Sequence, residues 1–143
     1  MKRFRFRLQR VLDVRVQIRD EARQELVRRN AERDHQIYVL AQLQDEFLQL
    51  GLVEGGTYSA SDLTRLGAYA ERLTIAIDKQ KVVVAEAIKA AEAAQERYIE
   101  VSKEAKAMEM LRDKKLQEHA AEQLKEEGAH LDEIAVQRAA RGV

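Results

Sequence analysis

The sequence predicts an all-α fold, a long antiparallel two-helix coiled coil (a helical hairpin) with a C-terminal helical overhang. The first observation behind this prediction is that the 143 residues include no proline, so no pyrrolidine ring forces a helix to stop. The second is a composition of 35% charged but only 5% aromatic residues, which is typical of long helices. The third is a long heptad pattern in the second half of the chain, which one cluster of glycines separates from the first half.

The first helix is expected over about residues 4–50, because apolar residues recur there at heptad spacing. The predicted seam residues of this helix are Leu12, Leu26, Leu40, Leu43, Phe47 and Leu50. Arg19 and Arg33 fall at the same heptad positions, so this seam is imperfect.

A turn is expected over residues 51–60, where Gly51, Gly55 and Gly56 form the densest group of helix breakers. Ser59, Ser61 and Asp62 follow as candidate N-caps, because their side-chain oxygens can accept hydrogen bonds from the free N–H groups of a first helical turn. The second helix is then expected over about residues 61–140.

The second helix carries the more regular seam, with alternating spacings of four and three residues. Its seam residues are Leu66, Ala70, Leu73, Ile77, Gln80, Val84, Ala87, Ala91, Ala94, Tyr98, Val101, Ala105 and Met108. Folding the chain about Gly56 places Phe4 opposite Met108, so about 35 residues, or ~50 Å of helix, would overhang. On this prediction His119 is a solvated polar position, and residues 1–143 form a single coiled-coil domain.

The charge is distributed unevenly, with eleven Lys and Arg against five Asp and Glu in residues 1–33. Such a basic end could bind nucleic acid or anionic lipid, or it could be a solvated arginine face. Only Phe4 and Phe6 interleave with these arginines, so base stacking is not supported and we expect no nucleic-acid partner. No apolar run approaches the ~20 residues that cross a bilayer, so we expect a cytoplasmic protein without direct membrane insertion.

No catalytic residues, cofactor or metal are expected. The glycines are not followed by the Lys-Ser/Thr of a phosphate-binding loop, and cysteine is absent. Two Glu-x-x-His motifs, Glu32–His35 and Glu127–His130, match part of a di-iron ligand set. In the expected hairpin they lie ~80 Å apart, so they are not expected to form one site. The sequence therefore predicts a non-enzymatic protein that binds other proteins.

Both ends of the chain resemble the flagellar type III export stalk family, the FliJ family. The N-terminal run Phe4-Arg-Phe6-Arg-Leu8-Gln9 opens a segment that resembles the family pattern F-x-F-x-L-Q-x-V-L-x-x-R. Glu122-Gln123, followed by residues 131–135 (LDEIA) and Arg138, resembles the family's C-terminal motif. The resemblance covers essentially the whole chain.

The resemblance implies a small cytoplasmic coiled coil similar to the central stalk of rotary ATPases. Its implied partners are the hexameric export ATPase, the export gate membrane protein and export chaperones, with peripheral association at the inner-membrane export apparatus. The implied gate-binding residues are Tyr69, Leu73, Ala76 and Gln80, although Leu73 and Gln80 also belong to the seam. The residues expected to face the ATPase ring are Phe4, Phe6, Arg7, Leu8, Leu124, Leu131, Asp132 and Glu133.

Two other protein-binding functions stay open at this point. One is a stalk or scaffold of a virulence-type III secretion system, and the other is a generic coiled-coil chaperone of the prefoldin type. The chaperone alternative is disfavoured because residues 51–60 contain few β-branched residues and predict no strand for oligomerisation.

Overall fold

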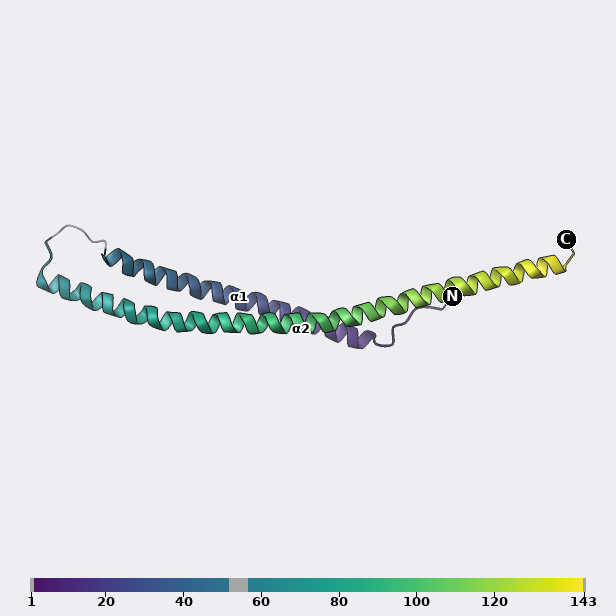
Figure 1. Cartoon of the computed structure of the whole chain (residues 1–143), viewed down its shortest axis with the longest axis horizontal. Helices are drawn as coiled ribbons and strands as arrows, with labels where there is room; N and C mark the ends of the chain where they lie inside the picture. The colour runs from purple at the N-terminus through teal and green to yellow at the C-terminus, as the bar shows by residue number, and fades with distance from the viewer. Residues whose placement is uncertain (1, 52–56, 143) are drawn as a thin grey trace. The chain divides into compact units, whose positions relative to one another are not determined.

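The computed structural model describes residues 2–51 and 57–142 and contains two long helices (Figure 1). They are α1 (Gln9–Gly51) and α2 (Ala60–Ala140), and the described residues form no strand. The predicted all-α helical hairpin is therefore confirmed. Of the predicted turn, residues 52–56 lie outside the described residues, while Gly51 ends α1 and residues 57–59 precede α2.

The start of α2 is fixed by a reciprocal cap between Ser59 and Asp62. The backbone N–H of Asp62 donates to Ser59 Oγ at 3.1 Å, and the backbone N–H of Ser59 donates to Asp62 Oδ2 at 3.2 Å. Two N–H groups that lack helical partners are thereby satisfied, as in a capping box. At the other end, Gly142 has a φ of 72°, a left-handed conformation that glycine adopts without strain after a helix.

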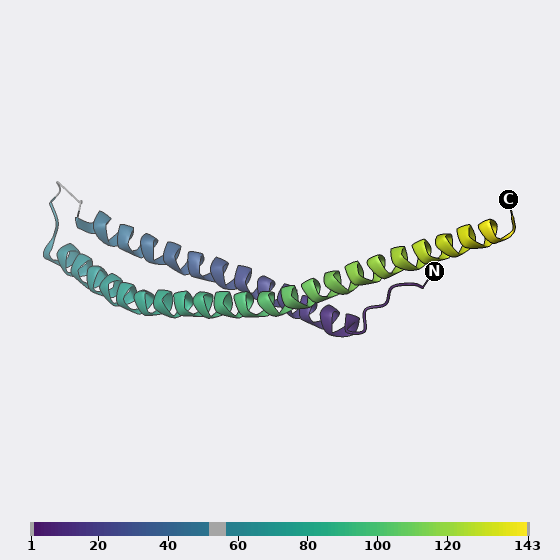
Figure 2. The same ribbon diagram turned by 45° about the vertical axis from the view of Figure 1, so that its right-hand side comes forward.

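The chain divides into two compact units, and each contains a stretch of both helices. The terminal unit comprises residues 1–20 and 100–143, and the hairpin unit comprises residues 21–99. In the hairpin unit α1 and α2 run antiparallel, side by side in both views (Figures 1 and 2). In the terminal unit, contacts between Arg15 and Glu104 and between Gln9 and Arg112 show the same antiparallel order. The single-domain expectation for residues 1–143 stays a prediction.

The predicted seam of α2 is confirmed, because every seam residue from Leu66 to Met108 is buried or half-buried. The most completely covered residues are Ala105, Ala91 and Val101, with 0%, 2% and 4% exposure. From α1, Leu12 and Ala22 are buried against this seam. Three of the seven buried core residues within the described ranges are alanines, whose small side chains allow two helix backbones to approach closely.

One polar pair lies inside the seam of the hairpin unit. Gln80 Nε2 donates to Gln36 Oε1 at 2.7 Å and to the backbone carbonyl oxygen of Gln36 at 3.0 Å. Both glutamines are half-buried, so this pair satisfies polar groups that the packing removes from water.

The predicted start of the first helix at Phe4 is wrong, because α1 begins at Gln9. Residues 2–8 are not helical, and the N–H of Gln9 donates to the carbonyl oxygen of Phe6 at 3.2 Å in the turn that enters the helix. The physical reason is the strict alternation of basic and apolar residues from Arg3 to Leu8. In an extended chain this alternation places the apolar side chains on one side, whereas a helix would spread them around its circumference.

No helix in the described ranges is long and apolar enough to cross a membrane.

Candidate functional site

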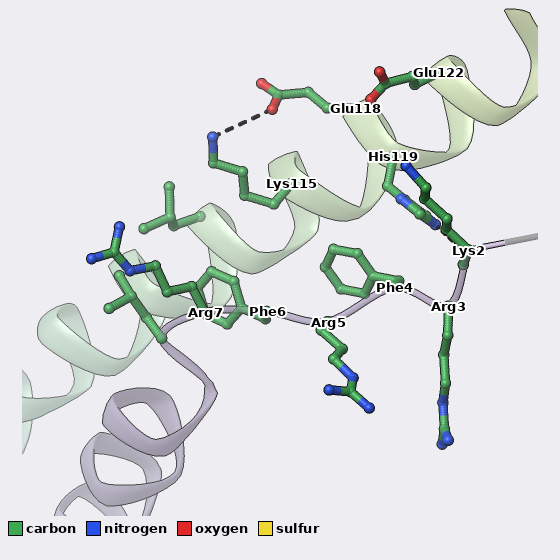
Figure 3. A pocket seen from close by; sticks show the side chains of 12 residues that line it. Lys2, Arg3, Phe4, Arg5, Phe6, Arg7, Lys115, Glu118, His119 and Glu122 are labelled. Carbon is green, nitrogen blue, oxygen red and sulfur yellow. Dashed lines mark hydrogen bonds and ion pairs between the residues drawn. The ribbon is translucent and has the colours of Figure 1, made fainter. Parts of the chain in front are cut away.

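The N-terminal arm, residues 2–8, lies along α2 in the terminal unit, extended over residues 2–6 and turning at Arg7 and Leu8 (Figure 3). The arm and residues 111–122 of α2 line one open groove. Phe4 points toward α2, where its ring centroid lies 5.5 Å from that of His119. The guanidinium carbon of Arg112 lies 5.7 Å from the same phenylalanine centroid, within the range of a cation–π contact.

Two polar side chains of α2 hold the backbone of the arm. Gln123 Nε2 donates to the carbonyl oxygen of Lys2 at 2.8 Å, and His119 Nε2 lies 3.1 Å from the same oxygen. Further along, Arg112 Nε donates to Gln9 Oε1 at 3.0 Å and so connects α2 to the first turn of α1. The arm is therefore held at both of its ends and through the Phe4 ring between them.

Two ion pairs continue this contact between α1 and α2. Arg15 pairs with Glu104, and Arg19 Nη1 lies 3.0 Å from Glu109 Oε1. All four side chains are partly exposed, so each pair contributes at most about 1 kcal/mol. Their main effect is on alignment, because each pair joins residues about 90 positions apart in the chain.

The predicted pairing of Phe4 with Met108 is wrong, as is the prediction that His119 is merely solvated. Phe4 lies against His119, and contacts with α2 continue to Gln123. The reason is that an extended residue spans about 3.3 Å, whereas a helical residue spans 1.5 Å, so the arm reaches further along α2 than a helix would. The overhang is correspondingly shorter than predicted, since it begins after Gln123 and measures about 25 Å to Ala140.

The overhang, defined as residues 124–140, exposes large apolar side chains. Leu124, Leu131 and Val136 are 70%, 65% and 67% exposed, and Ile134 is half-buried. Asp132 and Glu133 are exposed beside them. Leu124, Leu131 and Val136 are therefore open to contact by another protein.

The terminal unit contains all eight residues predicted to face an ATPase ring. Phe4 and Phe6 are half-buried in the arm, whereas Arg7 and Leu8 are exposed. The other four residues are in the overhang, beyond the last contact of the arm with α2 at Gln123. The predicted set therefore occupies two neighbouring parts of one unit, and its role in binding stays a prediction.

The four predicted gate residues, all in the hairpin unit, differ in burial. Leu73 is only 5% exposed and packs in the seam, while Ala76 and Gln80 are half-buried. Tyr69 is 42% exposed, and its hydroxyl donates to Glu46 Oε2 at 3.1 Å. That hydrogen bond to a carboxylate, together with the negative charge of Glu46, raises the pKa of Tyr69 above its ordinary value. Tyr69 is thus the most accessible of the four, and gate binding by this set also stays a prediction.

The two Glu-x-x-His motifs fall in different units, Glu32–His35 in the hairpin unit and Glu127–His130 in the terminal unit. Within residues 2–51 and 57–142, no three potential metal ligands lie close enough together to hold an ion.

Sequence reasoning missed Arg112 and Gln123 as residues that hold the arm. The predicted seam ends at Met108, so the sequence pattern assigns no contact to the polar residues that follow it on α2. The available signal was the period-two alternation of residues 3–8, which predicts an extended segment that needs polar partners for its backbone.

Comparison with known proteins agrees with the resemblance found at the chain ends. The family model described as "Flagellar FliJ protein" matches residues 4–143. No curated protein and no solved structure matches the chain. The matched range begins at Phe4 of the arm and includes Gln123 and the whole overhang, so it contains both the arm and the α2 residues that the arm contacts.

Proposed function

Because the chain belongs to the FliJ family of flagellar proteins, we propose that it is the central stalk of flagellar protein export. In this role it binds the hexameric export ATPase, connects that ring to the export gate membrane protein and interacts with export chaperones. It works in the cytoplasm at the inner-membrane export apparatus, and it promotes ATP hydrolysis by its partner without a catalytic site of its own.

The observation that carries this proposal is the exposed apolar surface of the overhang. Leu124 and Leu131 are seven residues apart, so they lie two turns apart on one face of α2. The seam line, by contrast, repeats through Val101, Met108, Lys115 and Glu122, which places it on the other side of the helix. A partner can therefore cover the overhang without displacing the arm from α2.

A ring lumen suits this surface because a stalk must be held weakly enough to move. The overhang offers isolated leucines beside Asp132 and Glu133 rather than one continuous apolar stripe. Each leucine supplies apolar area, while the carboxylates stay hydrated or pair with cations of the ring.

The hairpin unit provides the surfaces for the gate and for chaperones. Tyr69 is the proposed gate contact because it is exposed and lies close to the start of α2. Val27, Tyr38 and Leu48 on α1 are each more than half exposed and offer apolar contacts for chaperone helices.

Charge introduced on the overhang tests the ATPase contact. In the full chain, Leu124→Glu combined with Leu131→Glu should weaken binding to the cognate export ATPase by about a hundredfold, because two apolar contacts are lost. Stimulation of ATP hydrolysis should fall in parallel. The matched control is Leu48→Glu combined with Val82→Glu, which changes two residues of similar exposure in the hairpin unit.

The control should stimulate hydrolysis as the unmodified chain does. Equal stimulation by the overhang variant and the control, at equal helicity, would show that the overhang is not the ATPase-binding element.

A further inference from the structure

The arginines of the arm differ from the arginines of α1 in their partners. Arg3, Arg5 and Arg7 are exposed, and no carboxylate within the described residues pairs with any of them. In α1, by contrast, most arginines pair with carboxylates of the same chain. The paired residues are Arg15, Arg19, Arg28, Arg29 and Arg33. The positive charge of the arm is therefore available to an external anion.

The arm presents two of these arginines, Arg3 and Arg5, on one side, while Arg7 lies in the turn that enters α1. Alternate residues of an extended chain point to one side and repeat every ~6.6 Å. Phe4 points toward α2, whereas the side chains of Arg3 and Arg5 point away from it (Figure 3). Contacts of the arm with His119 and Gln123 hold the backbone, so the spacing of Arg3 and Arg5 is fixed before any partner arrives.

We propose that Arg3 and Arg5 form a pre-ordered strip, with Arg7 at its end in the turn into α1, that binds carboxylates on an acidic surface of a protein partner. His119 and Gln123 act as positioning residues, which touch the arm backbone and not the partner. This inference rests on the proposed function in one respect, since the partner is taken to be the export ATPase.

A protein partner suits the strip better than a lipid surface or a nucleic acid. All three residues are arginines, whose planar guanidinium groups bind carboxylates through two parallel hydrogen bonds. That geometry is useful only when the carboxylates are themselves fixed in space, as they are on a folded protein. A fluid membrane or a flexible polyanion would bind a mobile basic tail equally well. Fixing the arm on α2 would therefore not increase affinity for either of them.

Removing the charges tests the strip. The full-length triple variant Arg3→Gln, Arg5→Gln, Arg7→Gln should bind the cognate ATPase about tenfold more weakly or worse in calorimetry, with a shallower dependence on salt. The matched control is Arg23→Gln, Arg28→Gln, Arg29→Gln, which makes the same charge change in the hairpin unit. An equal loss for both triples would overturn the proposal, since net charge alone would then govern binding.

Loosening the arm without changing its charge tests the fixed spacing. Gln123→Ala and Phe4→Ala each retain every arginine but remove one attachment of the arm to α2. We expect each to weaken ATPase binding several-fold while helicity by circular dichroism stays the same. Binding equal to that of the unmodified chain would mean that the arm acts as a flexible tail, and the proposal would be wrong.

Further outcomes separate this inference from the proposed function. Vesicles of phosphatidylglycerol and a single-stranded oligonucleotide serve as alternative anions. If the arginine triple loses binding only to these anions and not to the ATPase, the strip is not a protein-binding site. If Leu124→Glu with Leu131→Glu abolishes ATPase binding and the arginine triple does not, only this inference fails. If the unmodified chain does not bind the ATPase, both fail.

Discussion

The contact between Tyr69 and Glu46 makes the hairpin unit sensitive to alkaline pH. The neutral phenol donates its hydrogen bond to the carboxylate, and the pKa of Tyr69 is raised because ionisation would remove that bond and create two adjacent negative charges. Because the pKa of Tyr69 is higher in the folded state than in the unfolded state, where it is about 10, the Tyr69–Glu46 hydrogen bond stabilises the fold fully only below about pH 10. The contribution is then lost as the pH rises through the raised value.

Replacing Glu46 with glutamine should therefore lower the pKa of Tyr69, since the charge is removed. Absorbance at the phenolate band, recorded against Tyr69→Phe, isolates the titration of this one tyrosine. In the unmodified chain Tyr69 should ionise at higher pH than in Glu46→Gln. Identical titrations in the two proteins would show that the contact does not persist in solution.

At the scale of single residues, the sequence predicted burial well and polar partners poorly. Leu73, Ala91 and Ala105 were predicted as seam residues and are buried, because apolar residues at heptad spacing must lie on one face of a helix. His119 was misinterpreted because a heptad position specifies a face of the helix but not what packs there. A histidine on that face can contact solvent or an extended segment, and only the three-dimensional structure distinguishes the two.

At the scale of the helices, one face of the first turns of α2 contains both a residue that packs against α1 and a residue that stays exposed. Tyr69 and Leu73 are four residues apart on that face, yet Leu73 is 5% exposed and Tyr69 is 42% exposed. Leu73→Ala should cost about 2–3 kcal/mol of unfolding free energy, because it leaves a cavity in the seam. Tyr69→Ala should change the free energy of unfolding far less but should lower affinity for the export gate protein.

Chemical denaturation and binding to the purified gate domain measure the two effects separately. Tyr38→Ala is a matched control, since Tyr38 is exposed on α1. A large loss of stability in Tyr69→Ala, or unchanged gate binding, would remove Tyr69 from the proposed gate contact.

The two helices could be predicted from the sequence, whereas the extended N-terminal arm could not. Both helices follow from local signals, namely heptad spacing and the glycine cluster, and Ser59 and Asp62 were among the candidate caps. The arm was predicted as helix because it adjoins the heptad pattern of the first helix, although residues 3–8 also follow a period of two. Only the contacts with α2 decide between the two patterns, and those contacts involve residues more than 100 positions away.

At the scale of the whole molecule, two C-terminal truncations should have different effects. The shorter truncation should remove only ATPase binding, whereas the longer one should also lower stability. A chain ending at Gln123 keeps every described contact of the arm and α1 with α2. It should melt within about 2 °C of the full chain but lose stimulation of the export ATPase. A chain ending at Met108 also loses the contacts of Arg112, His119 and Gln123, so its melting temperature should fall further.

Thermal unfolding followed by circular dichroism, with ATP hydrolysis assayed on the same samples, tests this prediction. Full stimulation by the chain ending at Gln123 would exclude the overhang from ATPase binding. A large drop in its melting temperature would show instead that the overhang stabilises the fold.

The glutamine pair in the hairpin unit restricts how the two helices can slide past each other. A seam rich in alanine offers few large side chains that interlock, so alignments shifted by one heptad would pack almost as well. Such a shift would place Gln80 beside Leu43 or Arg29 in place of Gln36. Toward Leu43, the Gln80 amide would lose its hydrogen bond to the Gln36 side chain, because leucine has no side-chain acceptor, at a cost of about 1 kcal/mol. Gln36 and Gln80 therefore select one alignment among several that hydrophobic packing alone would allow.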